Sequence, residues 1–118
     1  MINYNPSVGN ILCNTRTSTG TLITIPAGAV WSGDIMISAS IAAAATGTPR
    51  VSVVGTNAEP ATGTIVHQLS MTGLALSTVT DSCMIEVVVR APEGNAVTLE
   101  FNTGGATSAS ATVNGFIL

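Results

Sequence analysis

The sequence contains no lysine and only three arginines, and charged residues make up 8% of its 118 residues. Six carboxylates against these arginines give a net charge of −3. Proteins that bind nucleic acid usually present a basic surface that neutralises phosphates, so the charge balance argues against a nucleic-acid partner. A surface with so few charges must be covered by serine and threonine, by neighbouring subunits, or by both.

Long apolar runs are also missing, because serine, threonine, glycine or a charged residue interrupts every apolar stretch. A membrane-spanning helix needs about 20 consecutive apolar residues, so we expect no membrane-spanning segment. The first residues show neither a basic start nor an apolar stretch, which predicts no secretory signal and folding in a reducing cytoplasm. Apolar residues nevertheless make up 46% of the chain, and that content excludes a disordered protein.

Residues that bind metals or act as nucleophiles are scarce. Cys13 and Cys83 stand far apart and fit no metal-ligand spacing, so we predict two free, buried thiols, with a disulfide or a reactive thiol as the alternative. The single histidine, His67, shares a strand face with Ile65 and Leu69. We expect a buried or interface histidine bonded to the backbone, and the alternatives are a general base or a ligand.

The carboxylates show no catalytic pattern. Glu86 and Glu100 fall on outward positions of predicted strands, and the others fall at strand starts or turns, namely Asp34, Glu59, Asp81 and Glu93. Acid–base catalysis or a metal site needs such groups to converge, and no serine lies in a nucleophile-elbow context. We therefore predict that the protein is not an enzyme and uses no metal and no other cofactor.

Apolar residues recur with a period of two, which is the period of a β-strand. The alternation is clearest in residues 33–41, 83–91 and 95–101, weaker in 21–26, 50–54, 64–71 and 110–118, and an edge strand is added at 8–14. Glycine and proline turns separate these segments. Seven or eight short strands predict one all-β domain over residues 1–118, an antiparallel β-sandwich or jelly-roll-like fold, with a short N-terminal arm at about residues 1–11.

Two segments fit this pattern less well. Residues 38–46 contain Ile41 followed by four alanines, and alanine favours a helix, so a short helical turn competes with the strand there. We predict that residues 71–81 form a loop or a crossing between the sheets.

Aromatic residues supply only 3% of the sequence. Trp31 lies in a turn-rich stretch, where it either fills the core or anchors another chain. The candidate interface residues are Trp31, Tyr4, Phe116, Ile117 and Leu118. Burying the last three contributes roughly 1.5–3 kcal/mol each, so we expect the C-terminal end to be structurally necessary. Gly115 allows a bulge that turns Phe116 and Leu118 toward the core or a subunit.

Three stretches resemble sequences of small structural proteins of tailed phages. Residues 23–35 read ITIPAGAVWSGDI, residues 89–99 read VRAPEGNAVTL, and residues 111–118 read ATVNGFIL. These resemble head decoration, cement or head-fibre proteins. The resemblance implies a non-catalytic virion protein, made in the host bacterial cytoplasm, that stabilises the head lattice at the capsid surface. It also implies a homo-oligomer, with a homotrimer as the first expectation, and the major capsid protein as partner.

Other roles stay open. A ligand- or carbohydrate-binding β-sandwich module is one, although sugar sites favour exposed aromatic platforms and the chain offers only Trp31 and Tyr4 for this. A tail or spike component of a virion is another, and it differs from a decoration protein in location alone. An enzyme would require a catalytic constellation around His67.

Overall fold

The strands that the alternation predicts are present in the computed structural model, which describes residues 10–42, 48–55, 64–69, 78–106 and 108–118. Within these residues the strands are β1 (Ile11–Arg16), β2 (Gly20–Ile25), β3 (Val30–Ala42), β4 (Arg50–Gly55), β5 (Thr64–Gln68), β6 (Thr78–Arg90), β7 (Val97–Asn102) and β8 (Ser108–Ile117). β3 and β6 each contain 13 residues, so they are longer than the sequence predicts.

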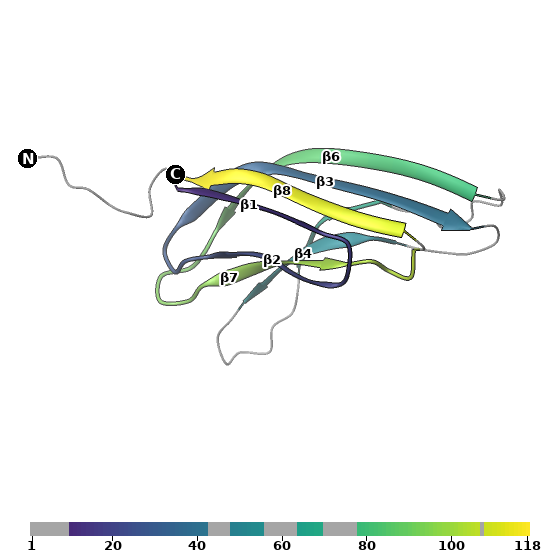
Figure 1. Cartoon of the computed structure of the whole chain (residues 1–118). Helices are drawn as coiled ribbons and strands as arrows, with labels where there is room; N and C mark the ends of the chain where they lie inside the picture. Colours follow the sequence, from purple (N-terminus) through teal and green to yellow (C-terminus); the bar gives the residue numbers. More distant parts are fainter. Residues whose placement is uncertain (1–9, 43–47, 56–63, 70–77, 107) are drawn as a thin grey trace, which may run out of the picture.

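The eight strands form two four-stranded antiparallel sheets: sheet A with the order β1-β8-β3-β6, and sheet B with the order β2-β7-β4-β5. Every connection except that between β4 and β5 leads from one sheet to the other, as in a jelly roll. Figure 1 shows the sheets as stacked layers, with sheet A above sheet B. The predicted antiparallel sandwich with a jelly-roll-like order is confirmed.

Alternate side chains of both sheets fill the space between the layers. On β3, Trp31, Ile35 and Ile37 are fully buried, and on β7 Leu99 and Phe101 face them from sheet B. Burying one large apolar side chain contributes about 1.5–3 kcal/mol. The period of two therefore assigns one face of each sheet to the core and leaves the other face outside.

Two glycines of sheet A make room for the indole of Trp31. Gly33 and Gly115 are register partners on β3 and β8. A Cβ atom added at either glycine would lie 2.6 Å from Cζ2 of Trp31, which is far closer than packed carbon atoms approach. The indole Nε1 donates a hydrogen bond of 3.2 Å to the carbonyl oxygen of Leu12 on β1. The ring and the two glycines therefore form one tightly packed unit.

The observed strand boundaries correct several expectations. β1 begins at Ile11, so the last residue of the expected N-terminal arm belongs to the sandwich. β6 begins at Thr78, inside the stretch predicted to be a loop. β3 continues to Ala42, so residues 38–42, where a helical turn was the alternative, form a strand, and the rest of that stretch at 43–46 lies outside the described residues. In the described part of the chain, no helix has the length and apolar character that a membrane crossing needs.

Candidate functional site

The outer face of sheet A, which points away from sheet B, carries side chains from four neighbouring strands. Register pairs align these side chains in rows across the sheet. The first row is Ile11, Phe116, Ser32 and Val88, the second is Cys13, Asn114, Asp34 and Glu86, and the third is Thr15, Thr112, Met36 and Met84. We call these three rows the A face.

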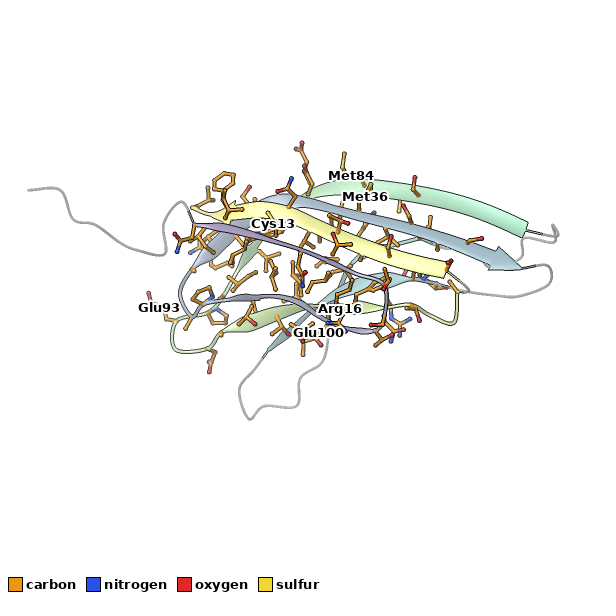
Figure 2. All side chains as sticks on the ribbon, in the orientation of Figure 1. Cys13, Arg16, Met36, Met84, Glu93 and Glu100 are labelled. Carbon is orange, nitrogen blue, oxygen red and sulfur yellow. The ribbon has the colours of Figure 1, made fainter. Side chains whose placement is uncertain are left out.

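Most large apolar side chains that are exposed in the described residues lie on the A face. Their exposed fractions are 75% for Ile11, 64% for Val88, 61% for Met84, 45% for Phe116 and 42% for Met36. Figure 2 shows Met36 and Met84 on the side of sheet A away from sheet B. Single exposed apolar residues are ordinary, but a group of them on one face indicates an interaction surface.

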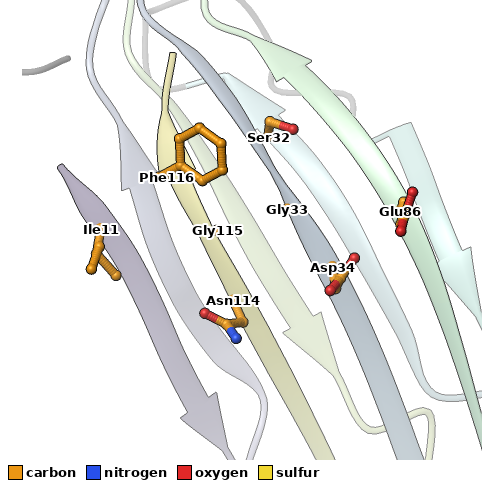
Figure 3. A pocket seen from close by; sticks show the side chains of 8 residues that line it. All are labelled: Ile11, Ser32, Gly33, Asp34, Glu86, Asn114, Gly115 and Phe116. Atoms are coloured by element: carbon orange, nitrogen blue, oxygen red, sulfur yellow. The ribbon is translucent and has the colours of Figure 1, made fainter. Parts of the chain in front are cut away.

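A hollow of about 590 Å³ lies across the first two rows of the A face. Its lining comes from β1, β8, β3 and β6, as Figure 3 shows, and includes the backbone of Gly33 and Gly115. Asp34 and Glu86 are register partners in this hollow, and like charges placed opposite each other destabilise a sheet. The hollow therefore combines two carboxylates with the ring of Phe116.

Polar side chains tie β1 to β8 on the A face. The thiol of Cys13 donates a hydrogen bond to Oδ1 of Asn114 at 2.9 Å. In the next row, the hydroxyl oxygens of Thr15 and Thr112 are 3.0 Å apart. These contacts join the edge strand β1 to β8 in the second and third rows of the A face.

The outer face of sheet B is polar by comparison. Register pairs place Thr24, Thr98 and Val54 in one row and Thr21, Glu100 and Ser52 in the next. The hydroxyl of Thr21 donates a hydrogen bond of 2.6 Å to the carboxylate of Glu100. None of the large exposed apolar side chains of the described residues lies on this face.

His67 joins the two sheets inside the sandwich. It is buried, and its Nε2 lies 3.2 Å from the carbonyl oxygen of Cys83 and 3.2 Å from the sulfur of the same residue. The predicted buried histidine with a backbone partner is therefore confirmed. Among the residues that the structure describes, no group of three or more His, Cys, Asp or Glu side chains could hold a metal ion.

The two thiols lie on opposite sides of sheet A. Cys83 is half-buried and packs against the core, whereas Cys13 is exposed. The prediction of two buried thiols is wrong for Cys13, because this residue takes an outward position on β1. Neither cysteine forms a disulfide, and β1 and β6 are the opposite edges of sheet A.

The predicted interface residues divide between the core and the surface. Trp31 and Ile117 are buried in the core. Of the two roles left open for Trp31, the core role is confirmed, and the interface assignment is wrong for both residues. Phe116 and Leu118 are 45% and 55% exposed, as a contact with another chain requires. Tyr4 lies outside the described residues.

The bulge predicted at Gly115 is wrong. β8 pairs with β1 and with β3 without a register shift, so regular alternation places Phe116 outward and Ile117 inward. The amide of Leu118 then donates a hydrogen bond of 2.8 Å to the carbonyl oxygen of Val30. The C-terminal segment is thus part of β8, a central strand of sheet A.

Four residues of the A face were missed as candidates: Ile11, Met36, Met84 and Val88. The last three occupy outward positions of strongly alternating segments, and a large apolar side chain at such a position was the available signal. Ile11 gave no such signal because it falls where the expected arm at about 1–11 overlaps the weak edge strand at 8–14.

Comparison with protein-family models gives no match, and comparison with curated protein sequences also gives none. Among solved structures, the chain is similar to one described as "CBM4 structure and function", a carbohydrate-binding module, with 11% identity and a TM-score of 0.40. The match covers 92% of this chain and 61% of that chain. The fold assignment itself rests on the strand order of the two sheets.

Proposed function

We propose that this chain is a non-catalytic structural protein that works by burying the A face against other protein subunits. The observation that carries the proposal is the grouping of exposed apolar side chains on one face of one sheet. Aromatic residues and methionine are enriched in protein interfaces, and charges are depleted at interface centres. The A face offers Phe116, Met36 and Met84, and its only ionised side chains are Asp34 and Glu86.

The specific role that we propose is head decoration or cement on a tailed-phage capsid. The support is the resemblance of residues 23–35, 89–99 and 111–118 to such proteins. A cement protein stabilises a closed shell through many modest contacts, and side chains held on a four-stranded sheet lose little conformational freedom on binding. The proposal includes the major capsid protein as a partner, the virion surface as location and a homo-oligomeric state.

A ligand-binding module is the second candidate, and the hollow on the A face favours it. Binding sites for small molecules place a few polar groups beside aromatic or apolar walls. The carboxylates of Asp34 and Glu86 can accept hydrogen bonds from sugar hydroxyls while the ring of Phe116 provides a stacking surface. Jelly rolls occur in both capsid and lectin domains, so the fold favours neither role.

Co-sedimentation with heads of the phage that encodes the chain tests the first candidate. The wild-type chain is expected to pellet with the heads, and the double substitution Val88→Ser, Phe116→Ser should weaken binding about tenfold or more by removing apolar contacts. Val54→Ser, on the outer face of sheet B, is the matched control and should bind like the wild type. Circular dichroism melts verify that all variants fold. Unchanged binding by the double variant would contradict the proposal.

Calorimetric titration with oligosaccharides tests the second candidate. A sugar site in the hollow predicts a binding heat for the wild type that Asp34→Asn removes, because a carboxylate acceptor is replaced by a weaker one. Glu100→Gln on sheet B should leave that heat unchanged. If the wild-type chain gives no heat with any oligosaccharide tried, the carbohydrate-binding proposal fails.

A further inference from the structure

We infer that the A face binds a second copy of this chain about a two-fold axis, with Arg90 of each copy against the Asp34–Glu86 pair of the other. This inference rests on the proposed function, because it takes the A face as the interface. It goes further by naming the occupant and the charges that set the register of the contact.

The outward positions of β6 supply the geometry. Glu86, Val88 and Arg90 are exposed at successive outward positions of this edge strand. A two-fold axis that runs along the first row of the A face places each residue of that row opposite its own copy and exchanges the flanking rows. Arg90 of one copy then lies opposite Glu86 of the second copy, and the reverse contact forms at the same time.

Within one chain, the strand register does not place Arg90 opposite either carboxylate. Arg90 is the register partner of Val30, whereas Asp34 and Glu86 are partners of one another. The strand rise separates Glu86 from Arg90 by about 13 Å along β6. A second copy would place a guanidinium against both carboxylates, and guanidinium–carboxylate contacts are among the strongest hydrogen bonds in proteins. The same contact removes the like-charge repulsion that the isolated sheet carries.

The apolar side chains of the first row would pack on their own copies along the axis. Ile11, Phe116 and Val88 are 75%, 45% and 64% exposed, so all three have surface to bury. β3 begins at Val30 and β6 ends at Arg90, so the two-fold contact spans the row of Arg90, the first row and the second row, and leaves Met36 and Met84 outside it. Four strands about 4.8 Å apart, in contact over about 20 Å, give roughly 400 Å² per copy and roughly 800 Å² for the pair. That area is typical of weak, transient interfaces, and we therefore expect a dimer that forms at high micromolar concentrations.

Analytical ultracentrifugation of variants with reversed charges tests the inference. The wild-type chain should change from monomer to dimer as its concentration rises through the high micromolar range. Glu86→Arg and Arg90→Glu should each weaken the dimer about tenfold or more, because each places like charges opposite one another. An equimolar mixture of these two variants should associate again, and so should the chain that carries both substitutions. Arg50→Glu on sheet B is the charge control and should leave the dimer unchanged.

Ile11→Ser separates face packing from edge pairing. Ile11 lies on β1, at the edge of sheet A opposite β6, so contact between two A faces predicts a weaker dimer. Pairing through the edge of β6 that faces away from β3 predicts no effect, and that result would overturn the face contact. Each variant is checked by its circular dichroism melt before association is compared.

Three outcomes would overturn the inference: a monomer at every concentration, a mass of three copies as the phage resemblance implies, or charge variants that associate like the wild type. A monomer that still binds phage heads, and loses that binding with Val88→Ser and Phe116→Ser, would refute the two-fold contact and leave the proposed function standing. A wild-type chain that forms the dimer but does not pellet with phage heads would refute the head-decoration role and leave the two-fold contact standing.

Discussion

The outer faces of sheets A and B differ although both sheets bury their inner faces in the same way. On sheet B, short polar side chains alternate with the core residues, and the one carboxylate of the central rows, Glu100, is bonded to Thr21. On sheet A, Met84 and Val88 extend into solvent, and Glu86 stands beside another carboxylate. Folding of the sandwich explains the inner faces of both sheets. It does not explain the exposed apolar side chains of the A face, which the proposed contact with another subunit would bury.

The largest effect is expected from Gly115→Ala, which tests whether the A face depends on its close contact with Trp31. A methyl group there would meet the carbonyl oxygen of Ser32, and it would lie 2.7 Å from Cα of Gly33. Backbone atoms cannot move aside easily, so the free energy of unfolding should fall by about 3 kcal/mol. Guanidinium denaturation measures the change.

Gly94→Ala is the matched control for that substitution. Gly94 has a φ of +87° and no atom within 4 Å of an added Cβ, so alanine there meets backbone strain without a clash. We expect a loss of about 1 kcal/mol. Equal losses at the two glycines would show that the contact with Trp31 is not tight.

The next effect on the free energy of unfolding compares two adjacent residues of β8, of which Ile117 points to the inner face of sheet A and Phe116 to the outer face. Ile117 is 2% exposed and Phe116 is 45% exposed. Ile117→Ala should lower the free energy of unfolding by about 2–3 kcal/mol, whereas Phe116→Ala should lower it by less than about 1 kcal/mol in the monomer. Urea denaturation at low protein concentration checks both values. A larger loss at Phe116 would mean that its ring contributes to the core.

The smallest effects come from the same substitution, glutamate to glutamine, on the two outer faces. We expect the free energy of unfolding to change with opposite signs. Glu86→Gln removes one charge of the Asp34–Glu86 pair and should stabilise the monomer by about 0.3 kcal/mol. Glu100→Gln weakens the hydrogen bond from Thr21 and should destabilise it by about 0.5 kcal/mol. Thermal melts at low and high salt measure both changes, and salt should reduce the gain from Glu86→Gln. Equal signs would remove the electrostatic contrast between the faces.

The sequence predicted the sandwich because its strongest signal is local. Alternation in residues 33–41, 83–91 and 95–101 depends only on neighbouring residues, and residues 33–41, 83–90 and 97–101 of these segments lie in strands. It also placed Met84, Glu86 and Val88 on one side of a strand. Which outward sides share one sheet depends on strand order, and strand order is set by long-range pairing that local patterns do not encode.

The errors have the same origin. Trp31 was ambiguous because the glycines that accept its ring, Gly33 and Gly115, are far apart in sequence and meet only through the pairing of β3 with β8. Cys13 was expected to be buried because small apolar thiols usually are, and only the pairing of β1 with β8 shows that it faces outward. A glycine in a final strand suggested a bulge, but here it provides space for an indole ring.

The packing of Trp31 against Gly33 and Gly115 also gives the molecule a spectroscopic reporter of its own. Trp31 is the only tryptophan, it is fully buried, and the two glycines whose missing side chains accommodate it also line the hollow of the A face. An occupant of that hollow therefore lies about one backbone thickness from the fluorophore, whereas a molecule on the outer face of sheet B is farther away by about the 10 Å spacing of stacked sheets. Energy transfer or quenching decreases steeply with distance, so the intrinsic emission of the unlabelled chain distinguishes which of its two outer faces is occupied.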